Sequence, residues 1–116
     1  MLVISRCGEH VREVRSLSVY PFRLYKDSEP MLINQMNMSE EHWEFYKKHI
    51  VGYGIFAENA THAYALFPDM ETAKEGLKKA YIKSSQTSCA DFEAIEEGYE
   101  FEKAIRTGIK ALKDRR

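Results

Sequence analysis

Residues 53–81 constrain the fold most, because local signals for two strands and a helix agree there. Apolar, aromatic-rich runs at 53–57 and 62–67 flank a polar segment, which is typical of a β-hairpin. Pro68 lacks the amide that a strand ladder needs, and Asp69 is a suitable N-cap for a following helix. In that helix the apolar residues recur with helical spacing, at Met70, Ala73, Leu77, Ala80 and Tyr81. Such a unit has an apolar face on each part, so it must pack against further structure.

The first third of the chain predicts more strands. Residues 1–5 are mostly apolar, and residues 10–17 fit an exposed strand better than a helix. Residues 19–26 alternate between two faces, and Pro21 within them is typical of an edge strand or a strand start. Residues 31–33 can form one more short strand.

These patterns predict one α+β domain that spans residues 1–116. Its sheet is expected to be antiparallel, with about four to five strands and with two to three helices packed mainly on one face. Besides the helix at 69–83, a helix is expected at 39–51, because Asn37 or Ser39 can cap its start and Gly52 can end it.

A last helical region is expected at 88–114, with Ser88 as its cap. Its first half has one apolar stripe, and its second half has another that is turned by roughly 120° from the first. A break or kink near Gly98 would explain the two directions, because glycine lowers helix propensity. The second stripe consists of Phe101, Ile105, Ile109 and Leu112.

That second stripe has two explanations. Both stripes can pack on the protein's own core if the helix bends at Gly98. Alternatively, the second stripe is a self-association surface of a two-fold homodimer. Residues 91–102 contain six acidic residues and no basic one, whereas 103–116 contain six basic residues and one acidic one. An antiparallel pair of copies would place acidic halves against basic halves.

Composition excludes several classes of protein. The chain has 116 residues, of which 44% are hydrophobic and 30% are charged, and no apolar run reaches the ~20 residues of a membrane span. A net charge of −1 excludes a simple polycation that binds nucleic acid through bulk charge. Two cysteines and no recognisable secretory signal indicate a cytoplasmic protein.

Four carboxylates form the clearest surface pattern, at Glu93, Glu96, Glu97 and Glu100. On a helix, this spacing gives one acidic face, which is either a solvated surface or a docking surface for a basic partner. The two E-x-x-E spacings resemble half of a carboxylate-bridged iron site, but no Glu in the chain has a His three residues later. The pattern therefore predicts partner binding and no metal.

Cys7 and His10 have a C-x-x-H spacing that suits a zinc ligand pair. A closed zinc site needs two more ligands, and only Cys89, His42, His49 or His62 could supply them. The sequence does not bring any of these next to Cys7 and His10, so neither a metal nor another cofactor is predicted.

His42 and His49 lie two turns apart on one side of the predicted helix at 39–51. They could act as general acid and base of a small metal-independent nuclease, with Tyr46 between them. The alternative is that each histidine is a boundary residue satisfied by a backbone carbonyl. No nucleotide-binding, dinucleotide-binding, hydrolase or zincin motif occurs, so the sequence favours a protein without catalytic activity.

Basic and aromatic residues alternate with core residues in the N-terminal strands. Aromatic rings that stack bases, combined with cations that contact phosphates, are typical of single-strand binding surfaces. The residues of this alternative nucleic-acid surface are Arg12, Arg15, Arg23, Tyr25 and Lys26. The leading hypothesis remains a small cytoplasmic adaptor, inhibitor or regulatory protein that binds another protein through charged helix faces.

Overall fold

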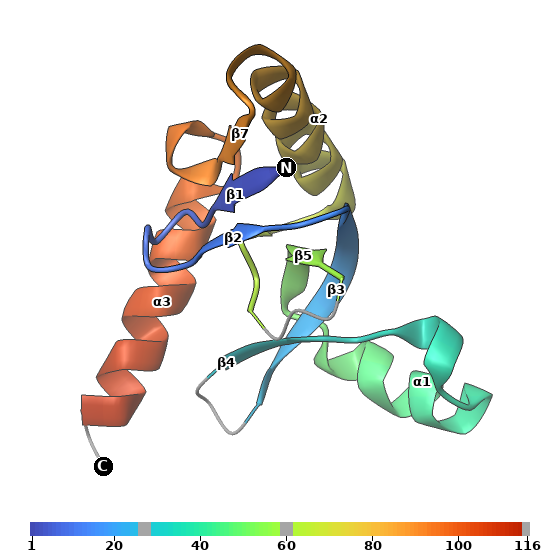
Figure 1. Cartoon of the computed structure of the whole chain (residues 1–116). Coiled ribbons are helices and arrows are strands. Elements are labelled where there is room, and N and C mark those ends of the chain that lie inside the picture. The colour runs from blue at the N-terminus through green and yellow to red at the C-terminus, as the bar shows by residue number, and fades with distance from the viewer. Residues whose placement is uncertain (26–28, 59–61, 115–116) are drawn as a thin grey trace.

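The larger of two sheets has four antiparallel strands in the order β4-β3-β5-β6, and Figure 1 shows β3, β4 and β5 of this sheet. The computed structural model describes residues 1–25, 29–58 and 62–114. The sheet consists of β3 (Leu17–Tyr25), β4 (Glu29–Leu32), β5 (Gly52–Ala57) and β6 (Ala65–Phe67). The antiparallel sheet and the hairpin predicted around residues 53–67 are therefore confirmed.

Pro21 lies in an interior strand, so the prediction of an edge strand is wrong. β3 pairs with β5 on one side and with β4 on the other, and its ladder with β4 covers Phe22 to Tyr25. The missing amide of Pro21 falls just beyond the end of that ladder. At this position Pro21 takes part in backbone pairing only through its carbonyl oxygen, which accepts a hydrogen bond from the Ile33 amide at 2.8 Å.

A second, smaller sheet was not expected. It has the order β2-β1-β7, in which β1 (Leu2–Ile4) pairs antiparallel with β2 (Val11–Glu13) and parallel with β7 (Cys89–Asp91). The expected helix at 88–98 is therefore wrong. Ser88 has a positive φ of 61° and ends the preceding helix, and a short 3-10 turn, η3 (Phe92–Ala94), follows β7.

The helices are α1 (Glu40–Tyr46), α2 (Met70–Thr87) and α3 (Tyr99–Asp114), with 3-10 turns η1 (Gln35–Asn37) and η2 (Lys47–His49) around α1. Ser39 and Asp69 cap α1 and α2 as predicted, by accepting hydrogen bonds from the His42 and Thr72 amides. α2 extends beyond the expected end at residue 83 and ends at Thr87, and in its polar last turns hydroxyls bond back to helix carbonyls, as Ser85 does to Ile82.

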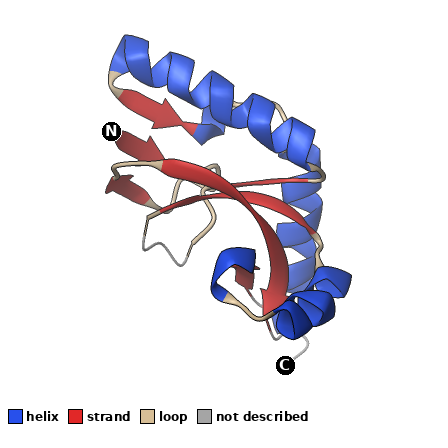
Figure 2. Cartoon of the chain, turned by 90° about the vertical axis from the view of Figure 1, so that its right-hand side faces the viewer, coloured by secondary structure: helices blue, strands red, loops and turns tan. Residues whose placement is uncertain are grey.

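The predicted α+β fold is confirmed, and the two long helices pack against different faces of the four-stranded sheet. Ala73, Leu77 and Ala80 of α2 pack in one core with Ile55 and residues of the small sheet, and Figure 2 shows α2 lying along this side. On the other face Phe22, Phe56 and Leu66 form a second core with the start of α3.

Gly98 marks the expected break, since α3 begins at the next residue and Gly98 has a φ of 75°. Phe101 and Ile105 of α3 pack against the second core, and Ile109 is buried. The side chain of Leu112, the last residue of the predicted stripe, lies outside the part of the chain that the structure describes. The three described residues of the stripe are thus covered by the protein itself, which favours the first of the two explanations, and self-association stays a prediction.

Candidate functional site

The four predicted partner-binding carboxylates do not form a helix face. Glu93 lies in η3, Glu96 and Glu97 lie in the loop before α3, and only Glu100 is helical. Because the helix begins at residue 99, the predicted spacing of a single face is lost. Glu93, Glu96 and Glu100 remain exposed, whereas Glu97 is largely covered.

Glu97 is used inside the fold. Its Oε2 accepts a hydrogen bond from Lys79 Nζ of α2 at 2.6 Å, and its carbonyl accepts one from Arg6 Nη2 at 2.6 Å. The hydrogen bond from Lys79 holds the pKa of the Glu97 carboxyl below its usual value, and the same bond raises the pKa of Lys79. Glu97 therefore ties the loop before α3 to α2 and to the end of β1.

A buried charge network lies beneath this loop. The Glu102 side chain is 3% exposed, and its Oε1 accepts a hydrogen bond from the Leu66 amide at 2.7 Å and lies 3.5 Å from Arg6 Nε. Its Oε2 accepts a hydrogen bond from Arg106 Nε at 2.8 Å. The guanidinium of Arg6 lies 5.0 Å from the ring centroid of Phe67. One carboxylate thus anchors β6, the end of β1 and α3 to one another.

Arg6 is only partly satisfied in this network. Its side chain is 4% exposed, and its Nε and Nη1 make no hydrogen bond within the described residues. Burial lowers the pKa of Arg6, and the nearby carboxylate of Glu102 works in the opposite direction. The sequence analysis did not identify Arg6 or Glu102 as partners in a buried network. The one available signal was the i,i+4 spacing of Glu102 and Arg106 next to the apolar stripe of α3.

Two depressions of opposite charge lie side by side over this network. The basic depression is lined by four cationic side chains, one carboxylate and three uncharged residues: Arg6, Lys103, Arg106, Lys110, Glu102, Cys7, Tyr99 and Thr107. The acidic depression is lined by Glu93, Ala94, Ile95, Glu96, Tyr99 and Glu100. Tyr99 belongs to both and is 47% exposed. Tyr99 therefore links the two depressions.

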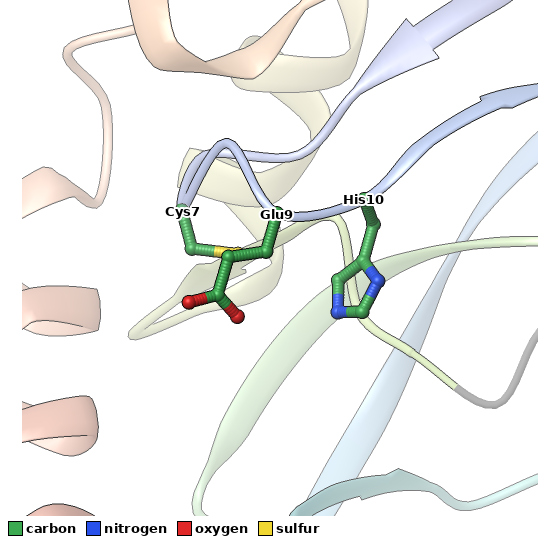
Figure 3. A group of neighbouring side chains, drawn as sticks. All are labelled: Cys7, Glu9 and His10. Atoms are coloured by element: carbon green, nitrogen blue, oxygen red, sulfur yellow. The ribbon is translucent and has the colours of Figure 1, made fainter.

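The turn between β1 and β2 brings together a second group of polar side chains. Cys7 Sγ, a Glu9 carboxylate oxygen and a His10 ring nitrogen all lie within 4.8 Å of one another. Figure 3 shows the three side chains pointing to the same side of the turn. His62, from the connection between β5 and β6, stacks on His10 with ring centroids 4.2 Å apart. The sequence contained the C-x-x-H spacing, but only the fold brings His62 to it.

His42 and His49 are both exposed, on α1 and η2 respectively. His49 Nδ1 lies 3.0 Å from the Phe45 carbonyl oxygen, and its ring lies against the Phe45 ring at 4.8 Å. The apolar sector expected around them is not a core face, since Phe45 is 59% exposed and α1 buries no residue. The carbonyl contact of His49 is the structural role that the sequence offered as the alternative to catalysis.

The residues of the alternative nucleic-acid surface are divided between the two sheets. Arg12 lies on β2 and Arg15 just after it, whereas Arg23 and Tyr25 lie on β3 and Lys26 lies outside the described residues. The Arg23 guanidinium lies over the Tyr46 ring at 4.8 Å.

Glu58 adds a negative charge beside this set of residues. Its carboxylate accepts hydrogen bonds from the Arg15 and Ser16 amides at 2.7 and 3.1 Å. These bonds lower the pKa of Glu58. A charged carboxylate therefore lies against the Arg15 backbone.

No protein-family model, curated protein or solved structure matches this chain. Within the described residues, no helix combines the length and the hydrophobicity needed to cross a lipid bilayer. Any functional inference therefore depends on the sites themselves.

Proposed function

We propose that this protein binds another protein through the surface formed by the basic and acidic depressions. The observation that carries the proposal is that these depressions, opposite in charge, share one exposed aromatic residue, Tyr99. Half-exposed tyrosines are common binding anchors, because the ring offers apolar contact and the hydroxyl can hydrogen-bond. We call this combined surface the docking surface.

The network below gives this surface a fixed geometry. Glu102 is held by a backbone amide and by two arginines, and Glu97 is held by Lys79, so the start of α3 is fixed on both sides. The cations and carboxylates on either side of Tyr99 therefore keep a defined separation. A preorganised surface loses less conformational entropy when a partner binds.

Charge complementarity defines the partner. A segment with an acidic side chain a few residues from a basic side chain can place its carboxylate near Lys103 and Lys110 and its cation near Glu93 and Glu96. Such an arrangement fixes the direction of the bound segment as well as its position. A regulatory or adaptor role in the cytoplasm is part of this proposal.

A binding assay with labelled peptides tests the proposal. The peptide set should contain one acidic and one basic residue at varied separations and in both orders, with all-acidic and all-basic sequences for comparison. We expect the mixed peptides of one order and spacing to bind best and to bind less tightly as salt is added.

Charge reversal on α3 is the decisive variant. Lys103→Glu with Lys110→Glu should weaken the selected peptide by at least about tenfold, since each factor of ten is only about 1.4 kcal/mol. Lys74→Glu with Lys78→Glu on α2 changes the net charge equally at exposed positions and serves as the control. Equal weakening in both variants, or tighter binding to single-stranded DNA than to any peptide, would contradict the proposal.

A further inference from the structure

The β1–β2 turn is held in one conformation by hydrogen bonds around Ser5. The Ser5 amide donates to the His10 carbonyl at 2.9 Å, and the His10 amide donates to Ser5 Oγ at 3.1 Å. Gly8 donates its amide to the Ser5 carbonyl at 2.9 Å and has a φ of 74°. Ser5 itself is fully buried. The residues between Ser5 and His10 are therefore presented from a rigid base.

This base presents three chemically different ligand atoms at one point. A thiol sulfur, a carboxylate oxygen and an imidazole nitrogen, from Cys7, Glu9 and His10, lie within 4.8 Å of one another. In a tetrahedral zinc site the ligand atoms are about 3.3 to 3.8 Å apart, as follows from the metal–ligand bond lengths. Side-chain rotations would bring the three atoms to that separation, and none of the three side chains is buried.

Two neighbours support the same site. Ser5 Oγ lies 3.2 Å from Cys7 Sγ, so a hydroxyl is available to hydrogen-bond a thiolate and orient it. The His62 ring lies against His10 with an angle of 16° between the ring planes, on the side of the turn that faces the β5–β6 connection. His62 therefore lies next to the candidate site, but it is not one of the three ligands that lie within 4.8 Å of one another.

We propose that this turn binds a transition-metal dication, with Zn²⁺ the best match, through Cys7, Glu9 and His10. The mixed sulfur, nitrogen and oxygen donor set suits zinc or cobalt and does not suit magnesium or calcium, which prefer oxygen ligands alone. Binding converts the Cys7 thiol to a thiolate and releases its proton to solvent. Cys7 also lines the basic depression of the docking surface, but Glu9 and His10 do not, and the metal site takes a different ligand. The metal titration can therefore fail or succeed without any peptide being bound.

Cobalt titration of the purified, chelator-treated protein tests the site. Co²⁺ bound by a thiolate and a histidine gives a thiolate-to-metal charge-transfer absorption and visible ligand-field bands, and we expect both with one equivalent of metal. Added Zn²⁺ should remove them by displacing cobalt.

Matched variants locate the ligands. Cys7→Ser should remove the charge-transfer absorption, and His10→Ala should weaken metal binding by at least about tenfold. Cys89→Ser and His42→Ala change the same residue types elsewhere and should leave binding unchanged. Circular dichroism should show that Cys7→Ser and His10→Ala stay folded, since these side chains lie in a surface turn, and the same measurement checks the two control variants. Absorption that persists in Cys7→Ser, or that is lost equally in Cys89→Ser, would overturn the proposal.

Discussion

Glu97 and Glu102 lie on either side of the start of α3, but they have different structural roles. Glu97 pairs with Lys79 at the surface, where the lysine side chain is 50% exposed. Glu102 is buried and joins Arg6, Arg106 and the Leu66 amide. Water screens the first pair but not the second, so removing one partner has very different consequences. A residue's place in an acidic run therefore says little about its role.

The same difference decides which acidic residues of the docking surface are available to a partner. Of the acidic residues at 93–102, Glu97 and Glu102 are engaged within the fold, whereas Glu93, Glu96 and Glu100 line an open depression. The internal pairs position the loop, and the open carboxylates remain to meet a partner. Substitutions in the two groups should therefore separate stability from binding.

The largest effect is expected from Glu102→Ala. It leaves the buried Arg6 without its carboxylate and the Leu66 amide without its acceptor, so the free energy of unfolding should fall by about 3 to 5 kcal/mol. Urea unfolding followed by circular dichroism measures the change. Glu100→Ala, in the same helical turn but exposed, should change it by less than about 0.5 kcal/mol. Similar losses in the two variants would show that the buried network is not the stabilising element.

The second largest loss of stability is expected at Gly98, which lies between Glu97 and Glu102 in the chain. An alanine there would need a φ of 75°, and its Cβ would lie 2.7 Å from the Leu66 carbonyl oxygen. We expect Gly98→Ala to cost about 1 to 3 kcal/mol. Gly108→Ala within α3 meets no atom within 4 Å and should stabilise the protein by about 0.5 to 1 kcal/mol. Thermal unfolding of both variants checks the opposite signs, and a stabilised Gly98→Ala would contradict the described break.

The smallest effect is expected from Lys79→Ala, which removes the surface pair. Glu97 has a lowered pKa in the folded state, so its contribution is present above the ordinary carboxyl pKa and is lost as pH falls through the lowered value. Lys79 has a raised pKa, so its contribution is lost as pH rises through that raised value. The stability difference between wild type and variant should therefore be greatest near neutral pH and shrink at both extremes and in high salt. A difference that stays constant with pH would exclude the ion pair as its cause.

The sequence predicted elements whose local signals were complete. The hairpin at 53–67, the caps Ser39 and Asp69 and the break at Gly98 depend on neighbouring residues, and the structure has all of them. β7 could not be predicted in this way, since three residues become a strand only because β1 lies beside them.

The candidate sites were less predictable than the fold for the same reason. The pairing of Arg6 with Glu102 and the stacking of His62 on His10 join residues far apart in the chain. The local signals in the sequence were the C-x-x-H spacing of Cys7 and His10 and the i,i+4 spacing of Glu102 and Arg106. The spacing of residues along the sequence does not predict contacts between residues that are far apart in the chain.

Nuclear magnetic resonance with the best peptide from the binding assay tests the docking surface most directly. If the docking surface binds the peptide, the amide signals that move should cluster at Glu93, Glu96, Tyr99 and Lys103, while those of α1 stay unchanged. Shifts confined to α1, where Phe45 is also exposed, would contradict the assignment of the surface around Tyr99 as the binding site.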